Sequence, residues 1–89
     1  MNSSTGWDLR IDPSVFKTLK KIPKRDAKNL LAVIRILPED PYYGDVQKMK
    51  GEEGAWRRRS GAYRIFYSIK VLNKIILVFK LERRTSKTY

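Results

Sequence analysis

The stretch from Trp56 to Tyr67 constrains the fold of this chain more than any other. It reads Trp-Arg-Arg-Arg, then Ser-Gly-Ala, then Tyr-Arg-Ile-Phe-Tyr, which is the pattern of two short strands joined by a tight turn. Four arginines lie inside this predicted β-hairpin, and burying an unpaired charge is very costly. One face of the hairpin must therefore meet solvent or an anionic partner.

The first half of the chain predicts one strand and two helices. Residues 7–11 alternate apolar and polar side chains, as a half-buried strand does. Asp12-Pro13 is a typical helix start, and Pro23 separates this first helix from a second one over residues 24–37. Because the link is short, we expect an antiparallel helical hairpin with one apolar stripe on each helix.

The second half predicts three strands, over residues 55–59, 63–69 and 75–82. Residues 42–54 are rich in turn formers and are expected to be irregular, and Asn73 is expected to take the left-handed conformation in the last turn. The predicted fold is α+β in the order β-α-α-β-β-β. A single domain over residues 1–89 would pack the helical hairpin on one face of a mainly antiparallel sheet and leave the other face partly open.

Composition excludes several kinds of site. The 89 residues include no cysteine and no histidine, so disulfides, thiolate metal sites and Ser-His or Cys-His mechanisms are ruled out. The sequence shows neither a glycine-rich phosphate loop nor a metal-ligand cluster, and we expect no metal and no cofactor. It also shows no signal peptide and no apolar run of about 18 residues, so we expect a cytoplasmic protein without a membrane span.

The charge is strongly basic and unevenly distributed. The formal net charge is +11, from 20 basic and 9 acidic residues. Residues 1–44 hold eight basic and five acidic side chains, whereas residues 45–89 hold twelve and four. A basic excess concentrated in predicted strands favours a polyanionic partner, either nucleic acid or an acidic protein, over a merely soluble basic surface.

The remaining reactive residue types suit RNA cleavage by transesterification. In that reaction the nucleophile is the 2′-hydroxyl of the substrate, so the protein needs only to orient it and to stabilise charge on the phosphorus. Arginine does the latter through paired hydrogen bonds to phosphate oxygens. Tyrosine and lysine can assist proton transfer only when their pKa values are perturbed from about 10.

Strand alternation separates the hairpin arginines. Arg57 and Arg59 are expected on one face of their strand and Arg58 on the other, as a solvated bystander. Arg64 should lie opposite the Arg57–Arg59 region. If the C-terminal tail folds back along the sheet, then Arg83 and the terminal tyrosine join this cluster.

Two of these placements have structural alternatives. Arg64 would instead form an ion pair with Asp45, Glu52 or Glu53, and Tyr89 would be an aromatic side chain packed on the surface. Trp56 and Tyr63 are better explained as packing residues of the sheet than as platforms for nucleic-acid bases.

The run LPEDPYYGDVQKMKGEEGAWRRRSGAYRIFY, followed by an apolar strand and ERRTSKTY, resembles the RelE/ParE superfamily of type II toxins. The shared features are a helical hairpin ending in Leu-x-x-x-Pro, a Lys48–Gly51 segment, the hairpin from Trp56 to Arg64, and a final strand leading to an arginine and a tyrosine. The resemblance extends over residues 7–89 and implies a RelE-like fold.

The resemblance also implies site residues. In RelE-like members, which cut messenger RNA in the ribosomal A site, the catalytic positions match Arg57, Arg64, Arg83 and Tyr89. RNA-binding positions are then expected at five further basic residues: Lys48, Lys50, Arg59, Arg84 and Lys87. A further basic position of some members falls on Ala55 here.

Such enzymes work without metal and leave a 2′,3′-cyclic phosphate and a 5′-hydroxyl. Their partners are the ribosome with its message and an acidic cognate antitoxin, here RelB-like. The general base stays open among Glu82, Tyr89 and a lysine of lowered pKa.

Two other functions remain. A ParE-like protein with the same fold would poison DNA gyrase, and a plain basic module would bind nucleic acid or an acidic partner without chemistry. Retention of Arg64, Arg83 and Tyr89 together favours the RelE-like branch.

Overall fold

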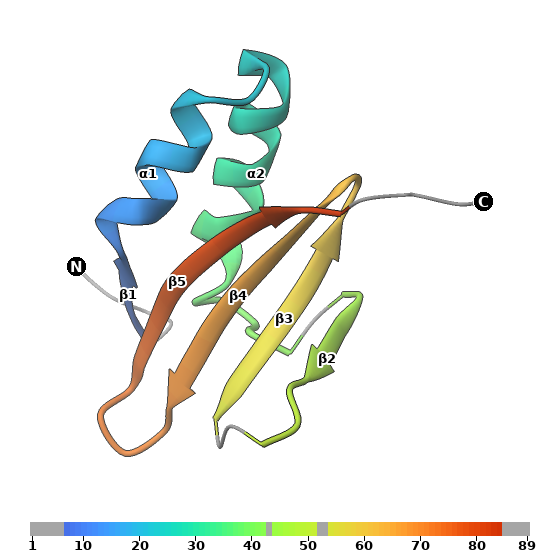
Figure 1. Ribbon diagram of the computed structural model, residues 1–89. Coiled ribbons are helices and arrows are strands. Elements are labelled where there is room, and N and C mark those ends of the chain that lie inside the picture. Colours follow the sequence, from blue (N-terminus) through green and yellow to red (C-terminus); the bar gives the residue numbers. More distant parts are fainter. Residues whose placement is uncertain (1–6, 43, 52–53, 85–89) are drawn as a thin grey trace.

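The computed structural model describes residues 7–42, 44–51 and 54–84, and it has two helices on a five-stranded sheet. It confirms the predicted α+β order, with one short strand added (Figure 1). The elements are β1 (Asp8–Ile11), α1 (Pro13–Lys20), α2 (Lys24–Ile36), β2 (Val46–Lys48), β3 (Ala55–Ser60), β4 (Tyr63–Lys70) and β5 (Ile75–Arg83).

The strand order across the sheet is β1-β5-β4-β3-β2. Strand β1 is parallel to β5, and every other neighbouring pair is antiparallel, so the sheet is mainly antiparallel as predicted. Both helices lie on the same side of this sheet (Figure 1). In the described part of the chain, no further layer covers its other side, called here the open face.

Local signals in the sequence account for the helix boundaries. The Asp12 side chain caps α1 by accepting a hydrogen bond from the Ser14 amide at 3.0 Å, and Pro13 occupies the first turn. Hydrogen bonds from Ser14 keep the pKa of Asp12 below its usual value. Pro23 then precedes α2, where its fixed φ suits a helix start.

The core lies between the helices and the covered face of the sheet. Val15 of α1 and Ile34 of α2 are fully buried, and so are Ile65 and Tyr67 of β4 and Ile76 of β5. Alternate residues of β4 point into this core, as the period of a strand requires. The predicted packing of the helical hairpin on one face of the sheet is therefore confirmed.

A β-bulge in β5 decides which face its last residues occupy. Tyr67 pairs with Val78 and Phe66 with Lys80, so Phe79 is an extra residue in β5. Without it, the alternation Ile76, Val78 would direct Lys80 into the core. The bulge instead puts Lys80 on the open face and buries Leu81 to 6% exposure.

Three expectations need correction. Residues 42–54 are not wholly irregular, because β2 forms within them and pairs with β3. Lys74, rather than Asn73, takes the positive φ of 56° in the last turn. The apolar stripe expected on the first helix is narrower than predicted, because Phe16 of α1 is 44% exposed and only Val15 and Leu19 of that helix are buried in the core.

Both helices in the described part of the chain are too short or too polar to cross a membrane.

Candidate functional site

The open face carries a row of charges near the β3–β4 turn. Cross-strand pairing places Glu82, Arg64 and Arg59 side by side on β5, β4 and β3. Arg64 Nη1 lies 3.8 Å from Glu82 Oε1, and Arg59 Nε lies 3.0 Å from Asp45 Oδ2. The alternative that pairs Arg64 with Asp45 is therefore wrong, and Glu52 and Glu53 lie outside the described residues.

The guanidinium of Arg64 is only partly satisfied by this row. Its Nε atom is buried without a hydrogen-bond partner among the described residues, while the side chain as a whole is 35% exposed. The 3.8 Å ion pair with Glu82 is long and half-exposed, so it holds Arg64 weakly. An incoming anion on the open face would find this guanidinium available.

A second row lies next to the first on the same face, two residues further along each strand. Lys80, Phe66, Arg57 and Gln47 pair successively across β5, β4, β3 and β2. Arg57 Nη2 donates to Gln47 Oε1 at 2.6 Å, which fixes the direction of that guanidinium. The structure thus brings Arg57, Arg59 and Arg64 onto one face, as strand alternation predicts.

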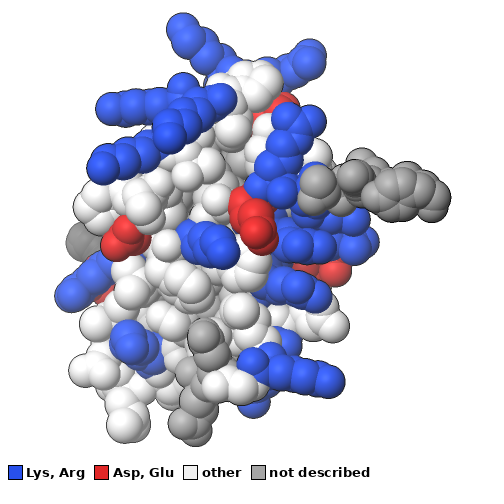
Figure 2. Space-filling view, in the orientation of Figure 1, with Lys and Arg blue, Asp and Glu red and all other residues white. Residues whose placement is uncertain are grey.

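Residues of β2 extend this basic surface to the edge of the sheet. A shallow pocket of about 270 Å³ is lined by Gln47, Lys48, Met49, Lys50 and Arg57. Lys48 and Lys50, both predicted as RNA-binding residues, thus line one hollow with Arg57. Figure 2 shows basic side chains on several sides of an uncharged area on the face toward the viewer.

Arg83 does not join these rows. It pairs with Tyr63, whose side chain points into the core, and its guanidinium carbon lies 5.9 Å from the centre of the Tyr63 ring. The bulge at Phe79 reverses the alternation of β5, so Arg83 follows the covered face and not the open one. Within the described residues Arg83 therefore lies apart from Arg64, and the tail whose folding back was to bring them together lies outside the described residues.

Arg84 stays at the tip of the β3–β4 hairpin. Its backbone amide donates to the Ala62 carbonyl at 2.6 Å, and its Nη1 donates to the Gly61 carbonyl at 3.3 Å. Its Nε is buried without a partner among the described residues. These contacts tie the end of β5 to the hairpin turn and keep Arg84 half-buried.

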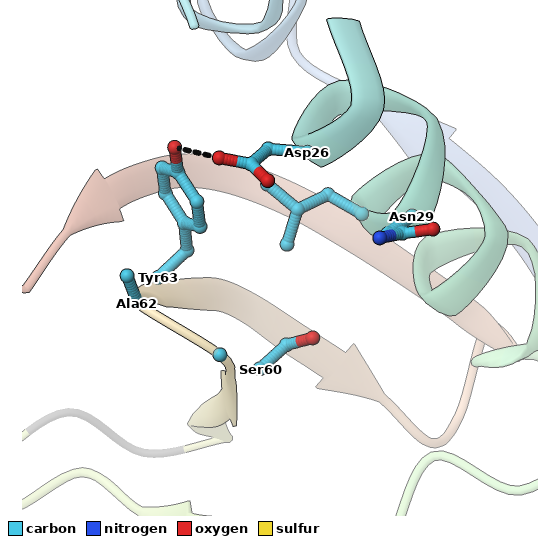
Figure 3. A pocket seen from close by; sticks show the side chains of 7 residues that line it. Asp26, Asn29, Ser60, Ala62 and Tyr63 are labelled. Atoms are coloured by element: carbon cyan, nitrogen blue, oxygen red, sulfur yellow. Dashed lines mark hydrogen bonds between the residues drawn. The ribbon is translucent and has the colours of Figure 1, made fainter. Parts of the chain in front are cut away.

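Tyr63 is a packing residue, as expected, and its side chain makes a hydrogen bond. Its ring is 4% exposed and its hydroxyl donates to Asp26 Oδ2 of α2 at 2.9 Å (Figure 3). Burial, followed by the Asp26 carboxylate, raises the pKa of Tyr63, while Arg83 opposes this shift. A pocket of about 250 Å³ beside this pair is lined by Asp26, Asn29, Leu30, Ser60, Gly61, Ala62 and Tyr63.

Arg58 is not a solvated bystander. It pairs with Ile65 on the covered side of the sheet and is half-buried there. Its guanidinium lies against Gly44, where an added Cβ would stand 2.9 Å from the Arg58 Cζ. The same loop is held by Tyr67, whose hydroxyl donates to the Pro41 carbonyl at 2.6 Å.

Tyr89 and Lys87 lie outside the described residues, so their roles stay predictions. Within residues 7–42, 44–51 and 54–84, no three Asp or Glu side chains gather as a metal site would require. What these two rows of the open face offer chemically is three guanidiniums, one ammonium and one carboxylate, which can bind phosphate oxygens and accept a proton.

Lys80 is not among the site residues that the sequence predicts, although it belongs to the second row. The signal was a single charged residue interrupting the apolar run Ile75–Leu81. A lysine at such a place must leave the core by some local irregularity, and the bulge supplies it.

The family model described as "ParE toxin of type II toxin-antitoxin system, parDE" matches residues 9–87. RelE1 of Methanocaldococcus jannaschii is 28% identical over 81 residues, which cover 88% of this chain and 90% of that protein.

Solved structures share the fold. A chain of the archaeal RelE–RelB complex from Pyrococcus horikoshii OT3 is 30% identical with a TM-score of 0.79, over 92% of this chain and 99% of that one. The isolated E. coli RelE toxin has the same fold at 16% identity and a TM-score of 0.75, over 91% of this chain and 87% of that one.

Proposed function

Because the chain belongs to the ParE toxin family of type II toxin–antitoxin systems, within the RelE/ParE superfamily, we propose that it is a RelE-like endoribonuclease that cuts messenger RNA on the ribosome. One observation carries this proposal: Arg57, Arg59 and Arg64 lie together on a sheet face that no other described element covers. A protein that only needed solubility would have no reason to align three guanidiniums across two strands.

The proposed reaction is an in-line transesterification. The 2′-oxygen of the message attacks the adjacent phosphorus, the bond from phosphorus to the 5′-oxygen breaks, and that oxygen takes up a proton. Arg64 and Arg57 bind the non-bridging oxygens, where negative charge grows in the transition state. The products are a 2′,3′-cyclic phosphate and a 5′-hydroxyl.

Several groups are candidates for accepting the proton of the 2′-hydroxyl. Glu82 lies on the open face beside Arg64, within 3.8 Å of its guanidinium, and it is a carboxylate that can accept the proton of the 2′-hydroxyl. Tyr89 and a lysine of lowered pKa are the other candidates. An enzyme built from such groups would be slow alone and would depend on the ribosome to hold the message in line.

The other basic residues would support binding. Arg59 and Lys50 extend the positive surface beside Arg57, and Lys48, which pairs with Trp56 on the covered side of β2, would add charge at the edge of the sheet. Arg84 and Lys87 would add charge near the C-terminus. Arg83 would approach the RNA from the end of the sheet, because it does not share the open face with Arg64.

The proposed partners follow from the family. Solved relatives include toxin–antitoxin complexes, among them the RelE–RelB complex of P. horikoshii and the RelBE2 complex of Mycobacterium tuberculosis. An acidic, RelB-like antitoxin that neutralises the basic open face would block access to the message. The place of action is then the cytoplasm, where ribosomes and messages meet.

A gyrase-directed function is the second candidate. Two observations favour it: the matching family model is the ParE toxin model, and Arg83 lies apart from Arg64. In that case expression would produce double-strand DNA breaks and leave translation unaffected at first.

Induction of the gene, followed by primer extension on cellular messages, separates the two. Our proposal predicts cuts in phase with codons that disappear when translation initiation is blocked. Intact messages together with broken DNA would contradict it and support the gyrase function. Intact messages, intact DNA and normal growth would leave a basic binding module without chemistry.

A further inference from the structure

We propose that the open face also holds a stacking site for one base of single-stranded RNA, formed by Phe79 beside Phe66, with Lys80 and Arg57 as flanking phosphate contacts. This inference rests on the proposed function for the identity of the RNA. It adds a recognition element that lies next to the Arg64 row and that the proposed chemistry does not require.

The two rings lie on the side of the sheet that has no covering helix. Phe66 and Phe79 have ring centroids 6.3 Å apart with planes tilted by 45°. Neither ring belongs to the core cluster between the sheet and the helices, nor packs against it. Phe66 is nevertheless only 7% exposed, so its neighbours on the open face cover it, while Phe79 is half-buried and keeps part of its ring accessible.

The bulge explains why the second ring is present on this face. Phe79 is the extra residue of β5 between the pairs Tyr67–Val78 and Phe66–Lys80. Bulges redirect side chains and are common beside functional sites. Phe79 is only half-buried on this open sheet face, so its burial contributes less to stability than that of a fully buried ring would. It is well suited to receive the flat face of a nucleobase.

Cations flank the rings. Lys80 Nζ lies 5.3 Å from the centre of the Phe66 ring, and its side chain is 56% exposed. On the other side, Arg57 pairs with Phe66 in register. Neighbouring strands lie about 4.8 Å apart, so Lys80 and Arg57 stand on opposite sides of Phe66 at roughly 10 Å. In single-stranded RNA a base likewise lies between two backbone phosphates. The base would contact the ring, and each phosphate would contact one of the two cations.

The positive charge around the two rings favours single-stranded nucleic acid as the ligand of this face. In Figure 2 the uncharged area has basic side chains on several sides with acidic side chains among them, and the protein carries a net charge of +11. Single-stranded nucleic-acid sites commonly combine such a positive groove with aromatic side chains on which bases stack. An acidic peptide would satisfy the cations but would gain nothing particular from an aromatic ring, which is the difference that the test uses.

The test measures binding of a short single-stranded RNA that contains 2-aminopurine and carries 2′-O-methyl groups, so that it cannot be cut. Stacking on Phe79 quenches 2-aminopurine fluorescence. Phe79→Leu keeps an apolar side chain and removes the aromatic face, and we expect it to lose the quenching and to weaken binding about tenfold. Phe79→Trp should retain both.

Lys70→Gln on β4 is the matched control for Lys80→Gln on the neighbouring strand β5. Lys70 is exposed and follows Phe66 on the same face of β4, about four residues or roughly 13 Å away. Lys80→Gln should weaken binding and lower the slope of log affinity against log salt by about 0.7, whereas Lys70→Gln should change neither.

Three results would overturn the proposal: no binding of the probe by the unmodified protein at low salt, equal quenching by the Phe79→Leu variant, or equal losses from Lys80→Gln and Lys70→Gln. Binding of a polyglutamate peptide with the same dependence on Phe79 would also overturn it, since the face would then be a protein-docking surface.

The proposed nuclease function can be rejected independently of the stacking site. Primer extension with the unmodified protein tests it, and the non-cleavable probe does not. Probe binding that depends on Phe79, without any cutting of messages, would leave the stacking site and reject the nuclease. Codon-phased cutting that is unchanged in Phe79→Leu, with unchanged probe binding, would leave the nuclease and reject the stacking site.

Discussion

The two faces of β4 are built from alternate residues of one strand, yet they serve different ends. Ile65 and Tyr67 point toward the helices and are fully buried, whereas Arg64 on the other side keeps 35% of its side chain exposed. Neighbouring residues therefore differ in what they contribute: burial of apolar surface stabilises the fold, and the uncovered charge has the binding role that we propose. The comparison predicts that substitutions on the covered face mainly lower stability, whereas substitutions on the open face mainly lower activity.

Arg58 shows that charge alone does not decide the face. It lies between Arg57 and Arg59 in sequence, but it is on the covered side and its guanidinium contacts the loop at Gly44. A charged side chain is tolerated there because it lies toward the β2 edge of the sheet, beyond the core that the helices close. The strand β3 thus uses one arginine for structure and its two neighbours for the open face.

The largest expected effect on the covered face comes from Ile65→Ala. The side chain is fully buried, and truncation leaves a cavity, so the free energy of unfolding should fall by about 2–5 kcal/mol. Chemical denaturation of the purified protein measures this. Lys70→Ala, on the open face of the same strand, should stay within about 0.5 kcal/mol of the unmodified protein. Equal losses from both variants would break the comparison of the two faces.

Tyr67→Phe should have a smaller effect with a characteristic pH dependence. It leaves the Pro41 carbonyl without its donor, which should cost about 1–3 kcal/mol. Burial raises the pKa of Tyr67 to about 12, above its unfolded value of about 10. The stability that this hydroxyl contributes is therefore complete below pH of about 10 and is lost as the pH rises from there through 12.

The measurement is the midpoint of urea unfolding at several alkaline pH values. The unmodified protein should lose more stability than Tyr67→Phe as the pH rises. Tyr42→Phe is the control, because that side chain is 50% exposed. Parallel pH curves for the unmodified protein and the Tyr67→Phe variant would show that the Tyr67 proton does not support the fold.

The smallest expected effect on stability comes from alanine substitutions at two glycines. Comparing them separates the cost of displacing Arg58 from the cost of backbone strain. Gly44 has φ of +94° and would place a Cβ 2.9 Å from the Arg58 guanidinium carbon. Gly51 has φ of +80° with nothing within 4 Å of its Cβ position. Gly44→Ala should cost about 1–2 kcal/mol, and Gly51→Ala should cost less, because only the former displaces a side chain. Thermal unfolding of both variants measures the difference, and equal costs would remove Arg58 from a structural role.

The order of elements could be predicted from the sequence because long, regular signals specify them. The Asp12-Pro13 start, the break at Pro23 and the apolar stripes fixed the helices, and the hairpin from Trp56 to Tyr67 fixed the centre of the sheet. Strand β2 was not predicted because its three residues, Val46–Lys48, are too few to show a period.

The composition of the site could be predicted only in part. Strand alternation correctly grouped Arg57, Arg59 and Arg64, since these residues lie in unbroken pairing. Alternation failed beyond Phe79, because one extra residue exchanges the faces of everything that follows it. The bulge is a response to tertiary packing, namely burial of Leu81 and exclusion of Lys80 from the core, and the lone Lys80 in the apolar run indicates an irregularity without giving its position.

The central claim is that the arginines of the open face act on messenger RNA, and a matched pair of arginine variants tests it most directly. Arg64→Ala removes a guanidinium from the proposed site. Arg10→Ala removes one from β1 on the same face, where Arg10 is 61% exposed, pairs with Leu77 and bonds only to its neighbour Asp8 among the contacts described.

The readout is codon-phased cleavage by primer extension, with the free energy of unfolding measured for both variants. We predict that Arg64→Ala lowers cleavage about 100-fold or more at unchanged stability, while Arg10→Ala stays close to the unmodified protein. Full cleavage by a stable Arg64→Ala variant would contradict the account.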